Sequence, residues 1–392
     1  MFLDSLKQQY KSFFSAKNIP EKTSAGSFSS LVYRLESPKS HLFDLDGENW
    51  VTGWAFYFGE KVVSELAVSA DEMVVGNFPV NVPRPDIGMH VPFVPAAQTC
   101  GFHFKLPAQS QDIKEIRIDV VYDDGTHAAF LTYDVEGVRQ LMPKFTGYQK
   151  QLQAIPVPGA ELVFLTQGHT QTDEYQNGII PAVLTMQSYL HKAGIDVEQI
   201  RNLLDFGCGS GRLLVGWHMI TPQIRLHGCD VNAQLIQWAQ QHLPKAIDCQ
   251  LSNLNPPLPY QEQQFDFVYL ISVFTHLSLE TQKNWIREFK RILRKGGYLL
   301  VTLHGELYVR NTFEQHSGHF QTFNSAGYVE EGQISVEGEN YYRTFHRYDF
   351  VSNLFNEFEI IGYFPNGNDK HRNTLFQIAQ SQDVYVLQYT GT

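Results

Sequence analysis

The stretch Leu203-Leu204-Asp205-Phe206-Gly207-Cys208-Gly209-Ser210-Gly211-Arg212 decides the fold of this chain. It has the pattern of an apolar strand that ends in an acid and continues into three glycines at alternate positions. Glycines at this spacing let the backbone turn sharply and approach a ligand with no Cβ in the way, while the following helix presents its free N–H groups. The spacing is one residue shorter than the G-x-G-x-x-G of pyrophosphate-binding folds, so a nicotinamide or flavin cofactor is the less natural ligand. The stretch predicts the wall of a site for a nucleotide-type cofactor without phosphates.

Further segments follow at the distances that such a site requires. A second strand ends at Asp230, nineteen residues after Gly211, where a carboxylate can accept hydrogen bonds from both ribose hydroxyls. Asn253-Leu254 precedes a proline-rich turn and would follow a third strand. The apolar run 265–271 has strand length, and residues 293–301 combine a helix stop with another strand.

Together these residues resemble the class I S-adenosylmethionine-dependent methyltransferases, over roughly residues 166–392. The resemblance implies that S-adenosylmethionine is the cofactor, that Asp205 helps hold its methionine part, and that Asp230 holds its ribose. It also places Asn253 against the adenine, with Leu254 beside the ring. The cofactor-binding residues that we expect are Asp205, Gly207, Cys208, Gly209, Gly211, Asp230, Val231, Asn253, Leu254 and Ser272.

A narrower likeness is to bacterial methyltransferases that carry the motif of residues 272–277 after the fourth strand and that of residues 302–305 after the fifth. Parts of this predicted site could instead have purely structural roles. The glycine turn alone could be any tight strand-to-helix connection, and Asp230 could also serve as a helix N-cap. Cys208 fits a small packed residue better than a nucleophile, because nothing near it in sequence would lower its pKa.

The order of elements predicts an α/β fold. A helix is expected over 179–193, before the first strand, and further helices over 213–220, 233–243 and 279–293, between strands. This alternation implies a Rossmann-like, mostly parallel sheet with helices on both faces and a ligand at the carboxyl ends of its strands. The closing strands are expected at 358–363 and 384–389.

The residues before this domain have a different hydrophobic periodicity. Between residues 38 and 138, apolar residues alternate at the strand period, and Asp124-Gly125 separates two alternating runs as in a β-hairpin. These features predict an all-β sandwich. The segment resembles a small β-sandwich module attached to bacterial glycosyltransferases and methyltransferases of surface-glycan pathways, on motifs such as Gly53-Trp54 and Arg84-Pro85-Asp86-Ile87.

The predicted domains are therefore 1–37 (an amphipathic helix over 2–16 and a connector), 38–138 (β-sandwich module), 139–165 (linker) and 166–392 (methyltransferase domain). The helix is expected to pack on a domain or on a second copy of the chain, which would make a homodimer. The linker is inferred from Pro143, Pro156, Pro158 and Gly159.

Composition limits the function. The net charge of −11, without a run of basic residues, argues against a nucleic-acid substrate. Four scattered cysteines give neither a disulfide framework nor a zinc signature, and no metal is expected. Without an apolar run of 18 residues, the chain is expected to be cytoplasmic and to lack a membrane span.

Two histidines are the candidate catalytic residues. His276 and His304 both follow strands whose carboxyl ends should face the cofactor, and an alcohol acceptor needs a base. The insertion 306–347 offers candidate acceptor-binding residues, Tyr328, Tyr342 and His346. The favoured hypothesis is O-methylation of a sugar or glycan. Methylation of another small molecule or a protein side chain, and a catalytically silent binding module, are the alternatives.

Overall fold

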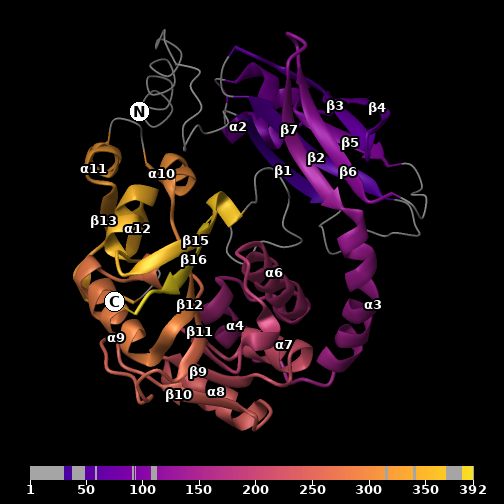
Figure 1. Cartoon of the computed structure of the whole chain (residues 1–392). Helices are drawn as coiled ribbons and strands as arrows, with labels where there is room; N and C mark the ends of the chain where they lie inside the picture. Colours follow the sequence, from indigo (N-terminus) through magenta and orange to yellow (C-terminus); the bar gives the residue numbers. More distant parts are fainter. Residues whose placement is uncertain are drawn as a thin grey trace. The chain divides into compact units, whose positions relative to one another are not determined.

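The computed structural model describes residues 31–37, 49–57, 60–90, 92, 94–106, 113–313, 317–338, 341–367 and 382–391. The chain divides into two compact units, one of residues 1–143 with 370–373 and the other of residues 144–369 with 374–392 (Figure 1). The helix expected over residues 2–16 lies outside the described residues. Within the described residues, no helix is both long enough and apolar enough to cross a membrane.

The N-terminal unit contains two antiparallel sheets, with strand orders β1-β2-β5 and β4-β3-β6-β7. The strands are β1 (Leu31–Ser37), β2 (Trp50–Tyr57), β3 (Val63–Ala70), β4 (Met73–Pro79), β5 (Gly101–Lys105), β6 (Glu115–Tyr122) and β7 (His127–Asp134), and the short helices α2 (Pro85–His90) and η2 (Pro95–Thr99) precede β5. Strand β1 lies in the segment that the sequence analysis assigns to a connector. Leu31, Tyr33 and Leu35 contribute to the buried core, and this alternation makes the segment a strand.

One buried cluster contains residues of both sheets, including Val51 and Phe102 of the first and Leu66 and Ile118 of the second. The predicted hairpin is confirmed as β6 and β7. At its turn, Gly125 has φ of +77°, which glycine adopts without the steric cost of a Cβ.

The stretch expected as an interdomain linker, 139–165, is largely helical, which its prolines did not indicate. Helix α3 (Val135–Leu152) includes Pro143, and α4 (Ala160–Gln167) begins directly after Gly159. A proline removes one backbone donor from a helix interior but does not always end the helix. Gly159 is the N-cap residue of α4, a position at which glycine is favoured.

The second unit is built on a seven-stranded sheet of order β10-β9-β8-β11-β12-β16-β15. Strands β10, β9, β8, β11 and β12 pair in parallel, whereas β16 is antiparallel to both of its neighbours. The strands are β8 (Asn202–Phe206), β9 (Arg225–Asp230), β10 (Ile247–Leu251), β11 (Phe265–Leu270), β12 (Leu293–Leu303), β15 (Phe358–Phe364) and β16 (Asp383–Tyr389). The expected mostly parallel sheet is confirmed, and its parallel strands bring their carboxyl ends to one edge.

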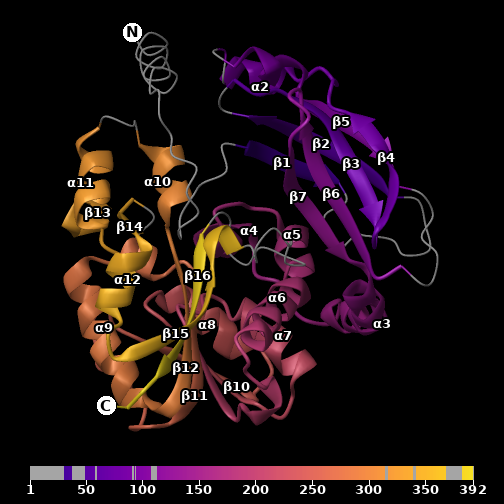
Figure 2. The same ribbon diagram turned by 45° about the horizontal axis from the view of Figure 1, so that its top comes forward.

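Helices cover both faces of this sheet: α9 and α12 lie on one side, and α6 and α7 lie on the other (Figure 2). The four predicted helices are confirmed within a residue or two. The elements besides the sheet are α4, α5 (Thr172–Asn177), α6 (Ile179–Lys192), η3 (Val197–Gln199), α7 (Arg212–Ile220), α8 (Ala233–His242), η4 (Phe274–His276), α9 (Leu279–Ile292), α10 (Glu306–Thr312), α11 (Gly318–Ala326), β13 (Tyr328–Glu331), η5 (Ile334–Val336), β14 (Arg343–His346), α12 (Tyr348–Leu354) and η6 (Pro365–Gly367).

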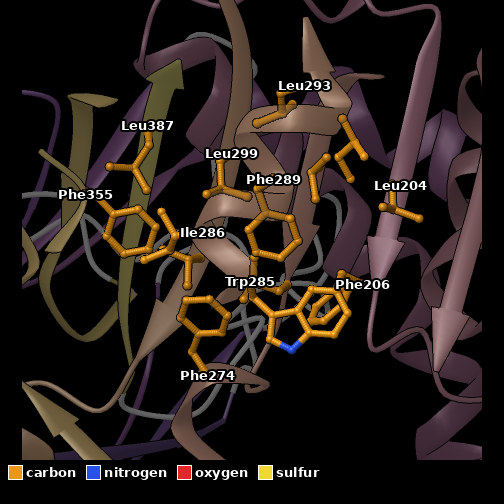
Figure 3. Close-up of a cluster of buried hydrophobic side chains, with 14 of the residues drawn as sticks. Leu204, Phe206, Phe274, Trp285, Ile286, Phe289, Leu293, Leu299, Phe355 and Leu387 are labelled. Carbon is orange, nitrogen blue, oxygen red and sulfur yellow. The ribbon is translucent and has the colours of Figure 1, made fainter. Parts of the chain in front are cut away.

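Helix α9 packs aromatic side chains against one side of the sheet. Trp285 and Phe289 pack against Phe206 at ring-centroid distances of 4.6 and 5.1 Å. Leu299 and Phe355 belong to the same buried cluster (Figure 3). This packing fixes the strand that leads into the glycine turn.

A fragment of residues 144–392 is expected to be more stable than one of residues 166–392. The shorter fragment loses the buried side chains of Leu152 and Val163, whose burial contributes roughly 3–6 kcal/mol. It also loses the Leu152 carbonyl that accepts from Gln176 Nε2 (2.7 Å). Thermal unfolding of both fragments measures the difference. Equal melting temperatures would show that α4 contributes nothing to the second unit.

Candidate active site

The glycine turn lies between β8 and α7, at the carboxyl edge of the sheet. Gly207, Gly209 and Gly211 all have positive φ, of +81°, +55° and +79°, a region that residues with a Cβ rarely adopt. The N–H groups of Gly207 and Cys208 both donate to the carbonyl of Cys229 (2.8 and 3.0 Å), which ties the turn to the end of β9. The turn therefore has a fixed shape that requires glycine.

The neighbours of the turn leave no room for side chains on these glycines. A Cβ on Gly207 would overlap Val273 Cγ2, and one on Gly211 would overlap Leu243 Cδ1. A Cβ on Gly209 would lie 2.6 Å from Thr166 Cγ2, on helix α4. Helix α4 and the loop after β11 therefore approach the turn closely.

Asp230 ends β9 beside this turn. Its Oδ2 accepts from the N–H of Gly209 (2.8 Å), and its Oδ1 accepts from the N–H of Asn232 (2.8 Å). Burial raises the pKa of the Asp230 carboxyl, and these backbone donors oppose the rise. The residue that caps α8 is Asn232, whose side chain accepts from Gln234 and Leu235. Asp230 therefore does not cap that helix and is half-buried at the sheet edge.

Asp205 ends β8 beneath the turn and is only 3% exposed. The pKa of its carboxyl is raised to about 7, mainly by burial and also by the charge of Asp230. The Tyr269 hydroxyl, which donates to Oδ2 (2.8 Å), and the charge of Arg212 oppose this rise in pKa. Arg212 also lies over the Tyr175 ring, 5.9 Å from its centroid. The result is a buried acid that changes charge near neutral pH.

The affinity for a cationic ligand at this site is expected to rise about tenfold between pH 6 and pH 8, because Asp205 ionises in this interval with a pKa of about 7. The raised pKa has the opposite effect on folding. The unfolded chain releases this proton near 3.8, so the contribution of Asp205 to the free energy of unfolding falls as pH rises from about 4 to about 7. Calorimetric titrations with S-adenosylmethionine across this range test the first statement. In Asp205→Asn the pH dependence should vanish, and its persistence would assign it to another group.

The residues around Asp230 fit an adenosyl group. Val231 is 50% exposed next to it, Asn253 is exposed, and Leu254 is half-buried against the apolar core. An apolar surface beside a carboxylate suits a base stacked next to a ribose. Cys208 is buried, and the other expected cofactor residues lie at the same edge. The glycine turn, the carboxylate of Asp230 and the apolar rim together fit the expected binding of S-adenosylmethionine.

Ser272 follows β11 with φ of +59°, although it is not glycine. Its N–H donates to Thr302 Oγ1 (2.7 Å), and its Oγ accepts from Gln382 Nε2 (2.8 Å). Val273, the next residue, is the one that packs on Gly207. The structure therefore brings Ser272 to the glycine turn.

The two candidate catalytic histidines lie together. Their ring centroids are 6.4 Å apart, and both rings are held by carbonyls around strand β14. The Nδ1–H of His276 donates to Tyr342 O (2.9 Å), and that of His304 donates to Thr344 O (3.1 Å). Since a carbonyl can only accept, both rings carry a proton on Nδ1.

The two histidines differ in their burial. His304 is 3% exposed, and burial lowers its pKa to about 3, with a further lowering by the charge of His276. Its ring stacks on Tyr308 at 3.9 Å. His276 is half-buried at the end of η4. His304 is therefore a neutral, weakly basic ring, whereas His276 is the more accessible of the two.

The three candidate acceptor residues make contacts within the 306–347 insertion and with α9. The hydroxyls of Tyr328 and Tyr342 both donate to the carboxylate of Glu330 (2.6 Å each). His346 is fully buried; its Nε2–H donates to Gln282 Oε1 (3.0 Å), and burial lowers its pKa to about 3. The structure thus places His346 inside the fold. It leaves the acceptor-binding role of all three residues a prediction.

Sequence reasoning missed Tyr269, the donor to Asp205, and the pair Thr302 and Gln382 that holds Ser272. Thr302 lies within the motif 302–305, which the sequence analysis uses for a family likeness, and Gln382 lies just before the expected closing strand 384–389. Their polar character inside apolar strand patterns was the available signal. Among the described residues, no group of three or more His, Cys, Asp or Glu side chains could hold a metal ion.

Known proteins resemble the part of the chain that carries this site. Residues 204–301 match the family described as "Methyltransferase domain". A protein of Bos taurus named "Probable tRNA methyltransferase 9B" is 33% identical over 100 residues, which cover 25% of this chain and 20% of that protein. An uncharacterized methyltransferase of Schizosaccharomyces pombe is 27% identical over 112 residues, covering 26% and 40%. The chain thus spans about a fifth of the length of the first of these relatives.

Two solved structures are also similar. An S-adenosylmethionine-dependent methyltransferase of Methanosarcina mazei aligns with 52% of this chain and 96% of its own, at 18% identity and a TM-score of 0.37. One of Mesorhizobium loti aligns with 52% and 97%, at 14% identity and a TM-score of 0.35.

The matched segment begins in β8, contains the glycine turn and Asp230, and ends in β12. The chain therefore carries a methyltransferase domain, and its cofactor is S-adenosylmethionine.

Proposed function

We propose that this enzyme transfers the methyl group of S-adenosylmethionine to a hydroxyl oxygen of a sugar or glycan. The observation that carries the proposal is His276, half-buried at the carboxyl edge with its proton fixed on Nδ1 by Tyr342 O. The cofactor supplies an activated methyl group, so the chain needs to orient the acceptor and exclude water. An alcohol must also lose its proton as it is methylated, and a neutral imidazole can accept that proton.

Within this proposal, His276 is the general base and its Nε2 receives the proton. His304 is too weakly basic for this task, because its pKa is about 3. It supports the site as a neutral ring packed between Tyr308 and the strand that holds His276. Both histidines depend on β14, so the 306–347 insertion is part of the proposed active site.

The N-terminal unit supports a glycan acceptor. We propose that its two sheets form the β-sandwich module that accompanies bacterial enzymes of surface-glycan synthesis, and that the enzyme acts in the cytoplasm. Support comes from the buried cluster shared by the two sheets and from the motifs Gly53-Trp54 and Arg84-Pro85.

Methylation of tRNA is a second candidate, favoured by the name of the Bos taurus relative. The similarity to that protein covers only 25% of this chain. A net charge of −11 is unfavourable for binding a polyanion. We therefore rank this candidate below a glycan.

The proposal is tested by methyl transfer from radiolabelled S-adenosylmethionine to a panel of nucleotide sugars, oligosaccharides, unmodified tRNA and peptides. Label in a sugar fraction supports it. Label found only in tRNA or peptide would show that the acceptor belongs to that class and is not a sugar. Cofactor binding without transfer to any member would favour a catalytically silent binding module.

A further inference from the structure

A closed ring of hydrogen bonds joins the ends of strands β11, β12 and β16. The N–H of Ser272 donates to Thr302 Oγ1 (2.7 Å), the Thr302 hydroxyl donates to Gln382 Oε1 (2.7 Å), and Gln382 Nε2 donates to Ser272 Oγ (2.8 Å). Thr302 and Gln382 are buried. Each member of the ring uses one donor and one acceptor, so the three groups satisfy one another.

The ring surrounds a residue in a disfavoured conformation. Ser272 has φ of +59°, where the Cβ of an L-residue lies too close to the backbone. Such a conformation persists only where the surrounding structure determines it. The ring provides this constraint, because it holds both the N–H and the hydroxyl of Ser272.

The direction of the chain after Ser272 determines two parts of the site. Val273 packs on Gly207, where a Cβ would overlap its Cγ2. The turn then continues into η4, in which the His276 N–H donates to the Val273 carbonyl (2.9 Å). The wall above the glycine turn and the proposed base therefore both follow from the conformation of Ser272.

We propose that Gln382 is a positioning residue that holds Ser272 in its left-handed conformation, and thereby sets Val273 against the glycine turn and His276 at the acceptor side. This role rests on the proposed function. Gln382 acts through Ser272 and Thr302. Its amide suits this place, because the same side chain accepts from Thr302 and donates to Ser272.

The test opens the ring at Gln382. In Gln382→Leu neither hydrogen bond of this side chain can form. Gln388→Leu is the control, because Gln388 lies on β16, the strand that follows Gln382, and its amide donates to Gly296 O (3.1 Å), away from the site.

The full-length variants are titrated with S-adenosylmethionine by calorimetry, and each affinity is divided by that of the unsubstituted chain. We expect Gln382→Leu to bind about tenfold more weakly, the equivalent of one or two lost hydrogen bonds, and Gln388→Leu to be unchanged.

A second pair of variants breaks the ring from another strand. Thr302→Ser keeps the hydroxyl and should bind the cofactor normally, whereas Thr302→Val removes it and should match Gln382→Leu. This pair decides the question if Gln382→Leu does not fold.

Normal affinity in Gln382→Leu and Thr302→Val would overturn the positioning role. Thr302→Ser binding as weakly as Thr302→Val would also overturn it, because this would indicate general packing. If the unsubstituted chain does not bind S-adenosylmethionine, the proposed function fails and the positioning role fails with it.

Discussion

His276→Ala is expected to lower the turnover number by about 10²–10⁴, the usual effect of removing a general base. The affinity for S-adenosylmethionine should stay close to that of the unsubstituted chain, because His276 lies on the acceptor side and is absent from the contacts of the glycine turn and Asp230. The measurement is the initial rate of methyl transfer to the acceptor identified in the screen, together with calorimetric titration of the cofactor.

His304→Ala and His227→Ala are the controls for this prediction. His304→Ala should lower the melting temperature, because it opens a cavity beside Tyr308, with a smaller loss of rate. His227 lies on β9 and contacts Asp248 (3.2 Å), so its substitution should change neither quantity much. A nearly normal rate for His276→Ala would assign this histidine to structure and move the search for a base to Tyr328, Tyr342 and the acids of the insertion.

Asp230→Ala is expected to weaken S-adenosylmethionine binding by about 2–3 kcal/mol, which corresponds to about 30–150-fold in Kd. The substitution removes the acceptor for two ribose hydroxyls. It also leaves the N–H groups of Gly209 and Asn232 without their carboxylate partner, so the turn itself loses support. Calorimetry with S-adenosylmethionine and S-adenosylhomocysteine measures the change.

Asp248→Ala is the matched control, because Asp248 is an exposed acid on the neighbouring strand β10 and pairs with His227. Its affinity for the cofactor should equal that of the unsubstituted chain. If Asp230→Ala also binds normally, the ribose site lies elsewhere and the assignment of the second motif is wrong.

The sheet and its main helices were predictable because they depend on local periodicity. The runs 265–271 and 384–389 are apolar at nearly every position, as expected for strands covered on both faces, and they form β11 and β16. The glycine turn was predictable for a similar reason, since its three glycines adopt the positive φ that the spacing suggested.

The local structure of the expected interdomain linker, 139–165, could not be predicted from composition. The linker was inferred from Pro143, Pro156, Pro158 and Gly159, yet α3 continues through Pro143 to Leu152 and α4 begins at Ala160. Prolines usually interrupt helices, so their presence did not indicate that most of this stretch is helical.

The contacts that shape the acceptor side could not be predicted, because they join residues far apart in the sequence. Gln382 lies 110 positions from Ser272, and His346 lies 64 positions from Gln282. A polar residue within an apolar pattern signals that it has a partner but does not identify that partner. The prediction thus found the histidines, and only the structure showed the carbonyls that orient them.

The central claim is that this chain binds S-adenosylmethionine at the glycine turn between β8 and α7. Isothermal titration calorimetry of the full chain with S-adenosylmethionine, S-adenosylhomocysteine and NAD tests it most directly. We expect saturable binding of the first two, lost or strongly weakened in Asp230→Ala, and no binding of NAD. Binding of NAD, or failure of the folded chain to bind S-adenosylmethionine and S-adenosylhomocysteine, would contradict the claim.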